Sequence, residues 1–415
     1  MRAVFVSYCH PQAPHICAVR LRAFAEVLAR QGHQIVLLTS NLSGVDKVKT
    51  VEEVQRELQI HNWDSPYYLP CPPISDALLW TLRRNQLPGI IRKALTAWYF
   101  LVKGGVFSDW TESSRRYWEV LSRSFKPEVV WATFGNTDAL LIAQAIARLS
   151  EIPWVMDMKD VWEAFVPKLI SGILVSRFKD VAGITYNSET TKNLDIWISN
   201  LRITVYSGFH KETEKSLLQG RDEIFRILLI GSIYSSNNLK TFFTALEAWL
   251  NSINKEERKK IEFIYAGGNW EEVQTAAISL SDLCNLKIEK YIEHDQLYEF
   301  MRNSNVNAYM AHGQFFHHKI IELLACNKPI LCYPADNQES TQIVKSVQGN
   351  MYSCSDTDKI VDSLNSIWEQ RNNEALPQID QEALASFSWE MQAKSLIDVF
   401  LKSIAKHKIK EQLDG

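Results

Sequence analysis

A lysine and a glutamate stand three residues apart in the segment 319–331, which reads KIIELLACNKPIL. In a helix, this spacing puts Lys319 and Glu322 on one face. The ammonium group can neutralise a diphosphate, and the carboxylate can accept two hydrogen bonds from the vicinal hydroxyls of a ribose. The same spacing is also typical of a surface ion pair beside an apolar helix face. Spacing alone leaves both interpretations open.

Two acids and a base follow a predicted strand at 153–157, which reads PWVMD. Asp157, Lys159 and Asp160 are therefore expected at the carboxyl end of a buried strand, where open α/β sheets bind ligands. A carboxylate there can take a proton or stabilise positive charge on a reacting carbon, and Asp160 is our catalytic candidate. The alternative is that one Asp caps the next helix and the other pairs with Lys159.

Glycines close two strands in the second half of the chain. Gly231 and Ser232 end the segment FRILLIGS, and Gly267 ends the segment IEFIYAG. Backbone amides at such positions can bind anions, and glycine permits close approach to the backbone, although a simple turn explains these residues equally well. No Asp-x-Asp motif directly follows any of the strands that the sequence predicts in this half. We therefore expect no metal and no cofactor.

The elements that must position these residues alternate between strand and helix patterns. Strands at 3–7 and 34–39 flank a helix at 18–31, and a second series of the same kind starts near Phe225. A βαβ start predicts a parallel sheet with right-handed crossovers. We predict an α/β protein with two Rossmann-like domains that face each other across a cleft.

The length supports this division, because 415 residues exceed what one ordinary core contains. We place the first domain at 1–206, a charged linker at 207–223 and the second domain at 224–385. Residues 386–415 are predicted to form a final helix and a tail.

A basic, aromatic segment at 73–107 interrupts the first series. Within it, the stretch 78–105 contains no acid and carries tryptophans, other aromatic residues and the cations Arg83, Arg84, Arg92, Lys93 and Lys103. This composition suits the surface of an anionic membrane. The alternative is a helical insertion that packs on the sheet, with its cations solvated.

Net charge and cysteine spacing indicate which partners the protein lacks and in which cellular compartment it is expected. The net charge of −3 predicts no attraction to nucleic acid, and the cysteines show no zinc-binding spacing. We interpret them as reduced thiols and expect a cytoplasmic protein, peripheral on the inner face of the cytoplasmic membrane if the basic segment binds there. We predict no signal peptide and no spanning helix.

The segment 319–331 resembles the family-four (group 1) retaining glycosyltransferases of bacterial polysaccharide biosynthesis. That resemblance implies the GT-B fold, with a C-terminal helix that returns to the first domain. It implies that Glu322 binds the donor ribose and Lys319 the diphosphate. Many members have a glutamate where this chain has Gln314, which would contact the donor sugar, and Tyr291 lies where members hold the base.

The resemblance continues through the first half of the chain. The opening loop and helix resemble the family's opening, and Arg20 matches an arginine common there. His15 stands in the loop that usually carries a glycine pair, and we keep it on the acceptor side with Arg20, Asp157 and Lys159. The segment PWVMDMKDVW also matches one branch of the family.

The resemblance implies transfer of a hexose or a related sugar from a nucleotide-diphosphate sugar to a hydroxyl acceptor, with retention. The acceptor is expected to be a lipid-linked or polysaccharide intermediate. The alternative is a non-catalytic GT-B homologue that binds a glycan or a partner enzyme. A sugar-nucleotide epimerase on the same fold is a third interpretation. A nicotinamide dehydrogenase is disfavoured, because no G-x-G-x-x-G follows the first strand.

Overall fold

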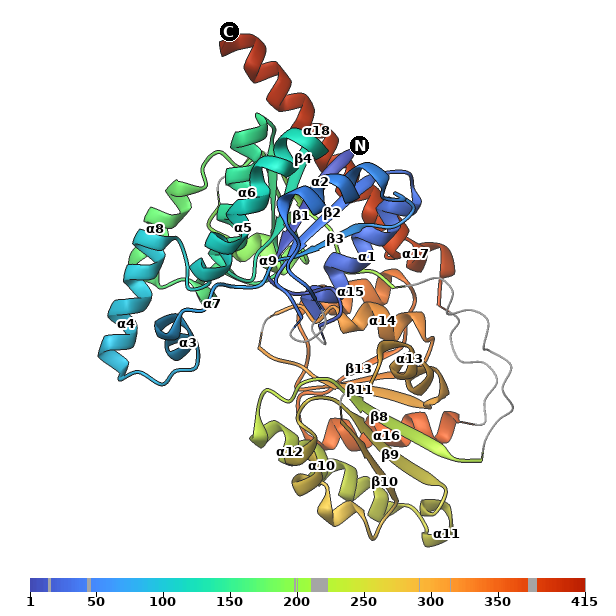
Figure 1. Ribbon diagram of the computed structural model, residues 1–415. Helices are drawn as coiled ribbons and strands as arrows, with labels where there is room; N and C mark the ends of the chain where they lie inside the picture. The colour runs from blue at the N-terminus through green and yellow to red at the C-terminus, as the bar shows by residue number, and fades with distance from the viewer. Residues whose placement is uncertain are drawn as a thin grey trace. The chain divides into compact units, whose positions relative to one another are not determined.

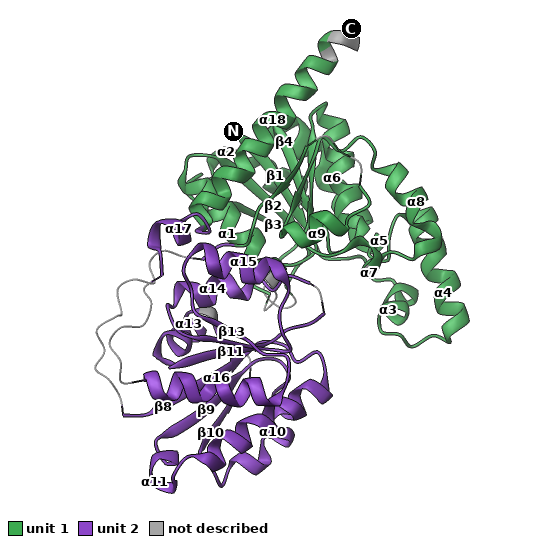
Figure 2. Ribbon diagram, turned by 180° about the vertical axis from the view of Figure 1, so that it is seen from behind, with its two compact units in different colours: residues 1–207, 389–415 green, residues 208–388 purple. Residues whose placement is uncertain are grey.

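The computed structural model of the chain describes residues 1–13, 16–42, 46–197, 199, 201–209, 223–290, 292–313, 315–371 and 379–414. The chain forms two compact units (Figure 2). Unit 1 comprises Met1–Ser207 with Trp389–Gly415, and unit 2 comprises Gly208–Ser388. Most of the predicted linker, 210–222, lies outside the described residues.

Unit 1 is built on a seven-stranded parallel sheet of order β3-β2-β1-β4-β5-β6-β7 (Figure 1). The order reverses direction at β1, so the loops after β1 and β4 diverge and leave room beyond the sheet edge. The strands are β1 (Arg2–Ser7), β2 (Gln34–Thr39), β3 (Tyr67–Pro70), β4 (Val129–Thr133), β5 (Trp154–Met158), β6 (Gly183–Tyr186) and β7 (Arg202–Thr204).

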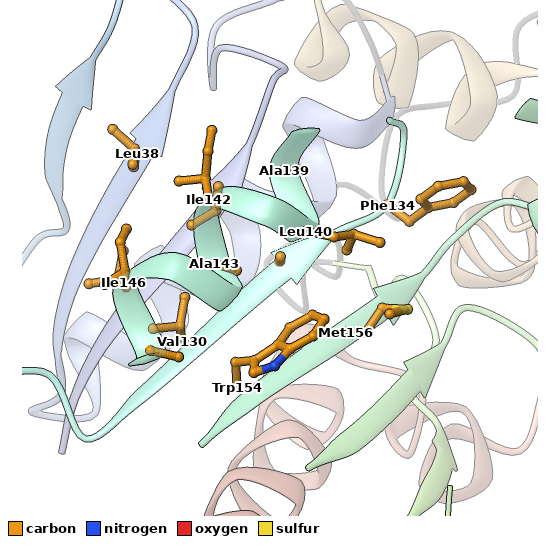
Figure 3. Close-up of a cluster of buried hydrophobic side chains, with 14 of the residues drawn as sticks. Leu38, Val130, Phe134, Ala139, Leu140, Ile142, Ala143, Ile146, Trp154 and Met156 are labelled. Carbon is orange, nitrogen blue, oxygen red and sulfur yellow. The ribbon is translucent and has the colours of Figure 1, made fainter. Parts of the chain in front are cut away.

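Helices cover this sheet. They are α1 (Ile16–Arg30), α2 (Val51–Ile60), α3 (Ala77–Arg83), α4 (Gly89–Trp98), α5 (Ser108–Val120), α6 (Thr137–Ser150), α7 (Trp162–Phe165), α8 (Lys168–Arg177), α9 (Glu189–Leu194) and α18 (Trp389–Asp414), with π-helices at Tyr99–Lys103 and Leu121–Phe125. Figure 3 shows α6 packed over β4 and β5, where Ile142, Ile146, Val130 and Met156 belong to one buried apolar cluster.

The last helix, α18, packs on α1 and completes the core of unit 1 on the other face of the sheet. Trp389 and Phe400 are both buried there. The Trp389 ring lies edge-on to Phe24 at 5.1 Å between centroids. The predicted return of the C-terminal helix to the first domain is therefore confirmed.

Unit 2 repeats the plan with a six-stranded parallel sheet of order β10-β9-β8-β11-β12-β13. Its strands are β8 (Phe225–Ile230), β9 (Ile261–Ala266), β10 (Asn285–Glu289), β11 (Val306–Met310), β12 (Ile330–Tyr333) and β13 (Met351–Ser353). Its helices are α10 (Ser236–Ser252), α11 (Lys255–Arg258), α12 (Trp270–Ala276), α13 (His294–Asn303), α14 (Lys319–Ala325), α15 (Gln338–Ser346), α16 (Thr357–Gln370) and α17 (Gln381–Ala385). The predicted α/β class with two parallel sheets is confirmed.

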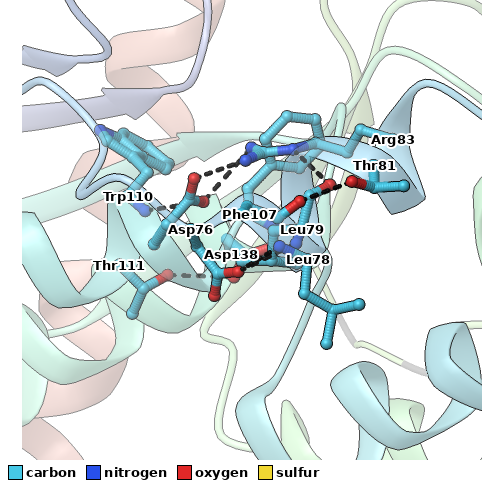
Figure 4. Close-up of polar contacts among 11 residues, drawn as sticks. Asp76, Leu78, Leu79, Thr81, Arg83, Phe107, Trp110, Thr111 and Asp138 are labelled. Carbon is cyan, nitrogen blue, oxygen red and sulfur yellow. Dashed lines mark hydrogen bonds and ion pairs between the residues drawn. The ribbon is translucent and has the colours of Figure 1, made fainter.

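The basic insertion is a set of short helices that buried polar contacts tie to unit 1 (Figure 4). Arg83 at the end of α3 pairs with Asp109 at 2.5 Å. Asp138, which is fully buried, accepts hydrogen bonds from the Phe107 amide at 2.9 Å and the Thr111 hydroxyl at 3.0 Å. Arg83 therefore fastens the insertion to the rest of unit 1, and its predicted contact with an anionic membrane stays a prediction.

Candidate functional site

In unit 2, Lys319 and Gly231 meet at the carboxyl edge of the sheet. Gly231 follows β8 with φ of +92°, a conformation that favours glycine. A Cβ placed on Gly231 would lie 1.5 Å from Nζ of Lys319. The ammonium group therefore rests directly on the glycine backbone, and any other residue at 231 would occupy its place.

A tyrosine and an asparagine that the sequence did not single out hold this turn. The Tyr265 hydroxyl donates to the Gly231 carbonyl at 2.8 Å and accepts the Asn269 amide at 3.1 Å. The Asn269 side chain in turn accepts the amide of Ile233 at 3.0 Å. Gly267 is required for this arrangement, because its Cβ would lie 2.4 Å from the Gly231 carbonyl oxygen.

The Lys319 ammonium group is an easily perturbed cation. Burial lowers its pKa to about 8, although the negative charge of Glu322 acts in the opposite direction. Glu322 lies one turn further along α14, with its side chain 8% exposed. The predicted pair is thus on one helix face, in a largely buried setting where a charge interacts strongly with an anion.

Of the other residues predicted on the donor side, the structure describes Ser232 but not Tyr291 or Gln314. Ser232 is exposed beside Gly231. Tyr291 and Gln314 lie outside the described residues, and β10 ends at Glu289, before the predicted end of that strand at 292.

His317 anchors the segment before α14, a role that the sequence did not predict. Its ring nitrogens approach the Asp336 carboxylate at 3.3 Å and the amide of His312 at 3.0 Å. The same carboxylate accepts a hydrogen bond from the Tyr309 hydroxyl. These contacts join the ends of β11 and β12 to the segment that carries Lys319.

In unit 1, Arg20 and Asp157 form a buried ion pair. The guanidinium group of Arg20 makes two hydrogen bonds to the Asp157 carboxylate, at 2.8 and 3.0 Å, and the side chains are 2% and 0% exposed. Thr185 adds a third bond to the same carboxylate, at 2.8 Å. The pair joins α1 to β5, and neither group faces solvent; their place on the acceptor side stays a prediction.

Lys159 and Asp160 remain at the carboxyl edge of β5. Their ion pair spans 2.5 Å, with Lys159 11% and Asp160 35% exposed. Burial lowers the pKa of Lys159, but Cys17 and Asp160 raise it by more, so the lysine stays charged. Asp160 is thus the solvent-accessible carboxylate of the predicted trio, whereas His15 lies outside the described residues.

The sequence of unit 2 matches a known family. Residues 224–370 match the family described as Glycosyl transferases group 1. Most of unit 2 therefore matches the group 1 glycosyltransferase family. The matched range includes the glycine turns of this domain and its Lys319–Glu322 pair. A search of the curated proteins finds no match.

Solved structures match the chain over nearly its full length. Sucrose-phosphate synthase from Thermosynechococcus elongatus has 12% identity and a TM-score of 0.66, with 98% of this chain and 99% of that chain covered. The Anabaena protein HepE, solved with UDP and glucose, has 13% identity and a TM-score of 0.55, with 100% and 99% covered. UDP-GlcNAc 2-epimerase from Neisseria meningitidis, bound to UDP-GlcNAc, has 13% identity and a TM-score of 0.52, with 97% and 100% covered. At such identities the likeness shows the fold, which is GT-B.

Proposed function

We propose that the chain is a glycosyltransferase that moves a hexose or a related sugar from a nucleotide-diphosphate sugar to a hydroxyl acceptor, with retention. The observation that carries the proposal is the ammonium group of Lys319 resting on Gly231 beside the carboxyl ends of β8 and β9. A cation supported by backbone at this edge suits a diphosphate. Two neighbours on the fold were solved with UDP or a UDP-sugar, which favours the same donor class here.

We assign the residues as follows. Lys319 stabilises the negative charge that develops on the departing diphosphate, and the Gly231 and Gly267 turns let that group approach the backbone. Glu322 accepts hydrogen bonds from the ribose. Asp160 in unit 1 is the candidate for contact with the acceptor hydroxyl or the reacting sugar, with Lys159 as its partner. No metal or cofactor takes part in this scheme.

The acceptor that we propose is a lipid-linked or polysaccharide intermediate. The basic, aromatic insertion supports this choice, because a lipid-linked acceptor requires work at a membrane surface. We place the enzyme on the inner face of the cytoplasmic membrane.

A second candidate function is a non-catalytic homologue that binds a glycan or a partner enzyme. One observation favours it: the exposed position after Gly231 is Ser232, so this turn offers no cation of its own. Lys319 then carries most of the charge for a diphosphate.

A thermal-shift screen against nucleotide-diphosphate sugars tests the donor assignment, because a ligand that binds the folded state stabilises it. We expect one base and sugar class to raise the melting temperature. Gly231→Ala should weaken binding of that ligand at least about tenfold, since a Cβ there displaces the Lys319 ammonium group and strains the backbone. Gly268→Ala is the matched control, because its Cβ meets nothing within 4 Å.

The outcomes separate the two candidate functions. Release of the nucleoside diphosphate from the bound sugar supports transfer or hydrolysis, whereas binding without release supports the non-catalytic homologue. If no nucleotide sugar shifts the melting temperature, or if both alanine variants bind equally well, the donor assignment fails.

A further inference from the structure

The helix α4 exposes its apolar side chains instead of burying them. None of its residues is buried, although Ile90, Ile91 and Trp98 are large and apolar, with exposed fractions of 86%, 50% and 45%. Val102 in the following π-helix continues the series at 61%. A helix that presents such residues to water normally covers something in its working state.

A second helix, α8, adds to this apolar surface. Leu169 is 97% exposed, and Ile173, one turn further along, is 55% exposed. The end of α8 is fastened to the insertion, because Arg177 donates to the carbonyls of Phe100 at 3.2 Å and Leu101 at 2.8 Å. Figures 1 and 2 both draw α8 next to α4. Together, Ile90, Ile91, Trp98, Val102, Leu169 and Ile173 form what we call the α4–α8 surface.

The charged residues within the segments that carry the α4–α8 surface have one sign. No Asp or Glu occurs in residues 77–108 or 164–179. Exposed cations do occur there, namely Arg84, Lys93, Lys103 and Lys168. Arg83 is not among them, because it pairs with Asp109. A protein partner with an apolar patch would not require this excess of positive charge, whereas an anionic bilayer attracts it.

A cavity of about 360 Å³ opens beside the α4–α8 surface. Its lining includes Val102, Lys103, Arg115, Trp118, Arg148 and Arg177. Arg115 and Arg148 have carboxylate partners, Glu112 and Asp180. The described contacts of Arg177 are to carbonyl oxygens, and Lys103 is exposed. Two cations without a described carboxylate partner thus face a hollow large enough for a phosphate group.

We infer that the α4–α8 surface docks on the face of an anionic phospholipid bilayer. The apolar side chains enter the interface, the exposed cations meet the anionic headgroups, and the cavity takes the phosphate of one lipid. Trp98 suits the interfacial depth, where its amphipathic ring is stable. Within the described part of the chain, no helix is both long and apolar enough to cross a membrane.

This inference deepens the proposal of a lipid-linked acceptor, but its test is separate from the donor site. The intact protein is floated with vesicles of phosphatidylcholine alone and with vesicles of equal parts phosphatidylcholine and phosphatidylglycerol. We expect binding to the anionic vesicles only, weakened by salt. The double variant Ile90→Asp with Leu169→Asp should lose at least about tenfold in partitioning, because both side chains leave water on docking. Both are so exposed that the fold should tolerate the change.

Matched variants give the control. Ile60→Asp with Ile278→Asp changes two residues that are 77% and 73% exposed and lie outside the α4–α8 surface, and it should bind as the native protein does. Lys93→Glu with Lys168→Glu should weaken binding about tenfold or more, whereas Lys402→Glu with Lys406→Glu should not. The Glu322→Ala variant should no longer bind the nucleotide sugar but should still bind the vesicles. This result distinguishes failure of the donor site from failure of the α4–α8 surface.

Three results would overturn the inference. The first is that the native protein does not bind anionic vesicles. The second is that the variants of the α4–α8 surface bind them as the native protein does. The third is that the control variants weaken binding as much as the surface variants do. If inorganic phosphate raised the melting temperature of the protein and the protein did not bind vesicles, the cavity would be a site for a soluble phosphate instead.

Discussion

At the scale of single residues, the buried ammonium group of Lys319 lowers the stability of the folded protein but is suited to bind a diphosphate. Burial lowers its pKa to about 8, so the unfolded chain holds this proton more tightly than the folded one. The folded protein therefore carries a penalty at neutral pH, and its stability rises as the pH increases from about 8 to about 10.5. A bound diphosphate would remove the penalty by pairing with the ammonium group.

Replacing this lysine should separate the two effects. Lys319→Met is expected to raise the free energy of unfolding at pH 7 by on the order of 1–3 kcal/mol, because the desolvated charge is gone. The same change should weaken binding of the nucleotide sugar. Only the native protein should lose affinity for this ligand as the pH rises through about 8. Calorimetric titration and chemical denaturation between pH 6.5 and 9 measure both. Native affinity that does not vary with pH would contradict the role of the ammonium group.

At the scale of elements, the attachment of the basic insertion depends on Asp138 at the start of α6. Its carboxylate receives the Phe107 amide and the Thr111 hydroxyl, and Gly105 packs so close that a Cβ there would lie 2.0 Å from it. Burial raises the pKa of Asp138 to about 7, against the lowering effect of these hydrogen bonds. The insertion is thus held by a carboxyl group that titrates near neutrality.

This attachment predicts a pH dependence of stability. Because the folded-state pKa is raised, the contribution of Asp138 is fully present below about pH 4 and is lost as the pH rises through about 7. Asp138→Asn should therefore flatten the fall in unfolding free energy between pH 5 and 8 and lower the stability at pH 5 by no more than about 1–2 kcal/mol. Denaturation curves across this range measure the slope, and a slope equal to that of the native protein would refute the assignment.

At the scale of the whole molecule, the final helix belongs to the first unit although unit 2 intervenes in the chain. Trp389 and Phe400 are buried among residues of β1 and α1, with the Phe400 ring 6.1 Å from that of Phe5. Removing large core aromatics costs roughly 3–5 kcal/mol each, and a domain has only about 5–15 kcal/mol in total. Unit 1 should therefore not fold stably without α18.

Truncation tests this dependence. A chain that ends at Ser388 is expected to lose the cooperative melting of unit 1 and to retain that of unit 2. A chain that ends at Lys408 removes only the last part of α18, beginning with the exposed Ile409, and should keep both transitions. Differential scanning calorimetry resolves these transitions. Two intact transitions in the shorter chain would show that α18 is dispensable.

Features that depend on local pattern could be predicted from the amino-acid sequence. Apolar strands that alternate with helix patterns predicted two parallel sheets, because the 2.0 and 3.6 residue periods act over a few neighbouring residues. The spacing of Lys319 and Glu322 likewise placed both on one face of α14. The return of α18 came from the resemblance to a family, and packing of Trp389 on Phe24 gives its physical basis.

The partner of each charged group, in contrast, depends on the three-dimensional fold. Asp157 pairs with Arg20, and Arg83 pairs with Asp109, although the sequence suggested a ligand-facing role for Asp157, Arg20 and Arg83. The placement of Lys319 on Gly231 likewise joins segments far apart in the chain. Such partners depend on strand order and on the side chains that each helix brings to a sheet edge. No local period encodes that choice, because the Coulomb energy depends on distance in space and on burial.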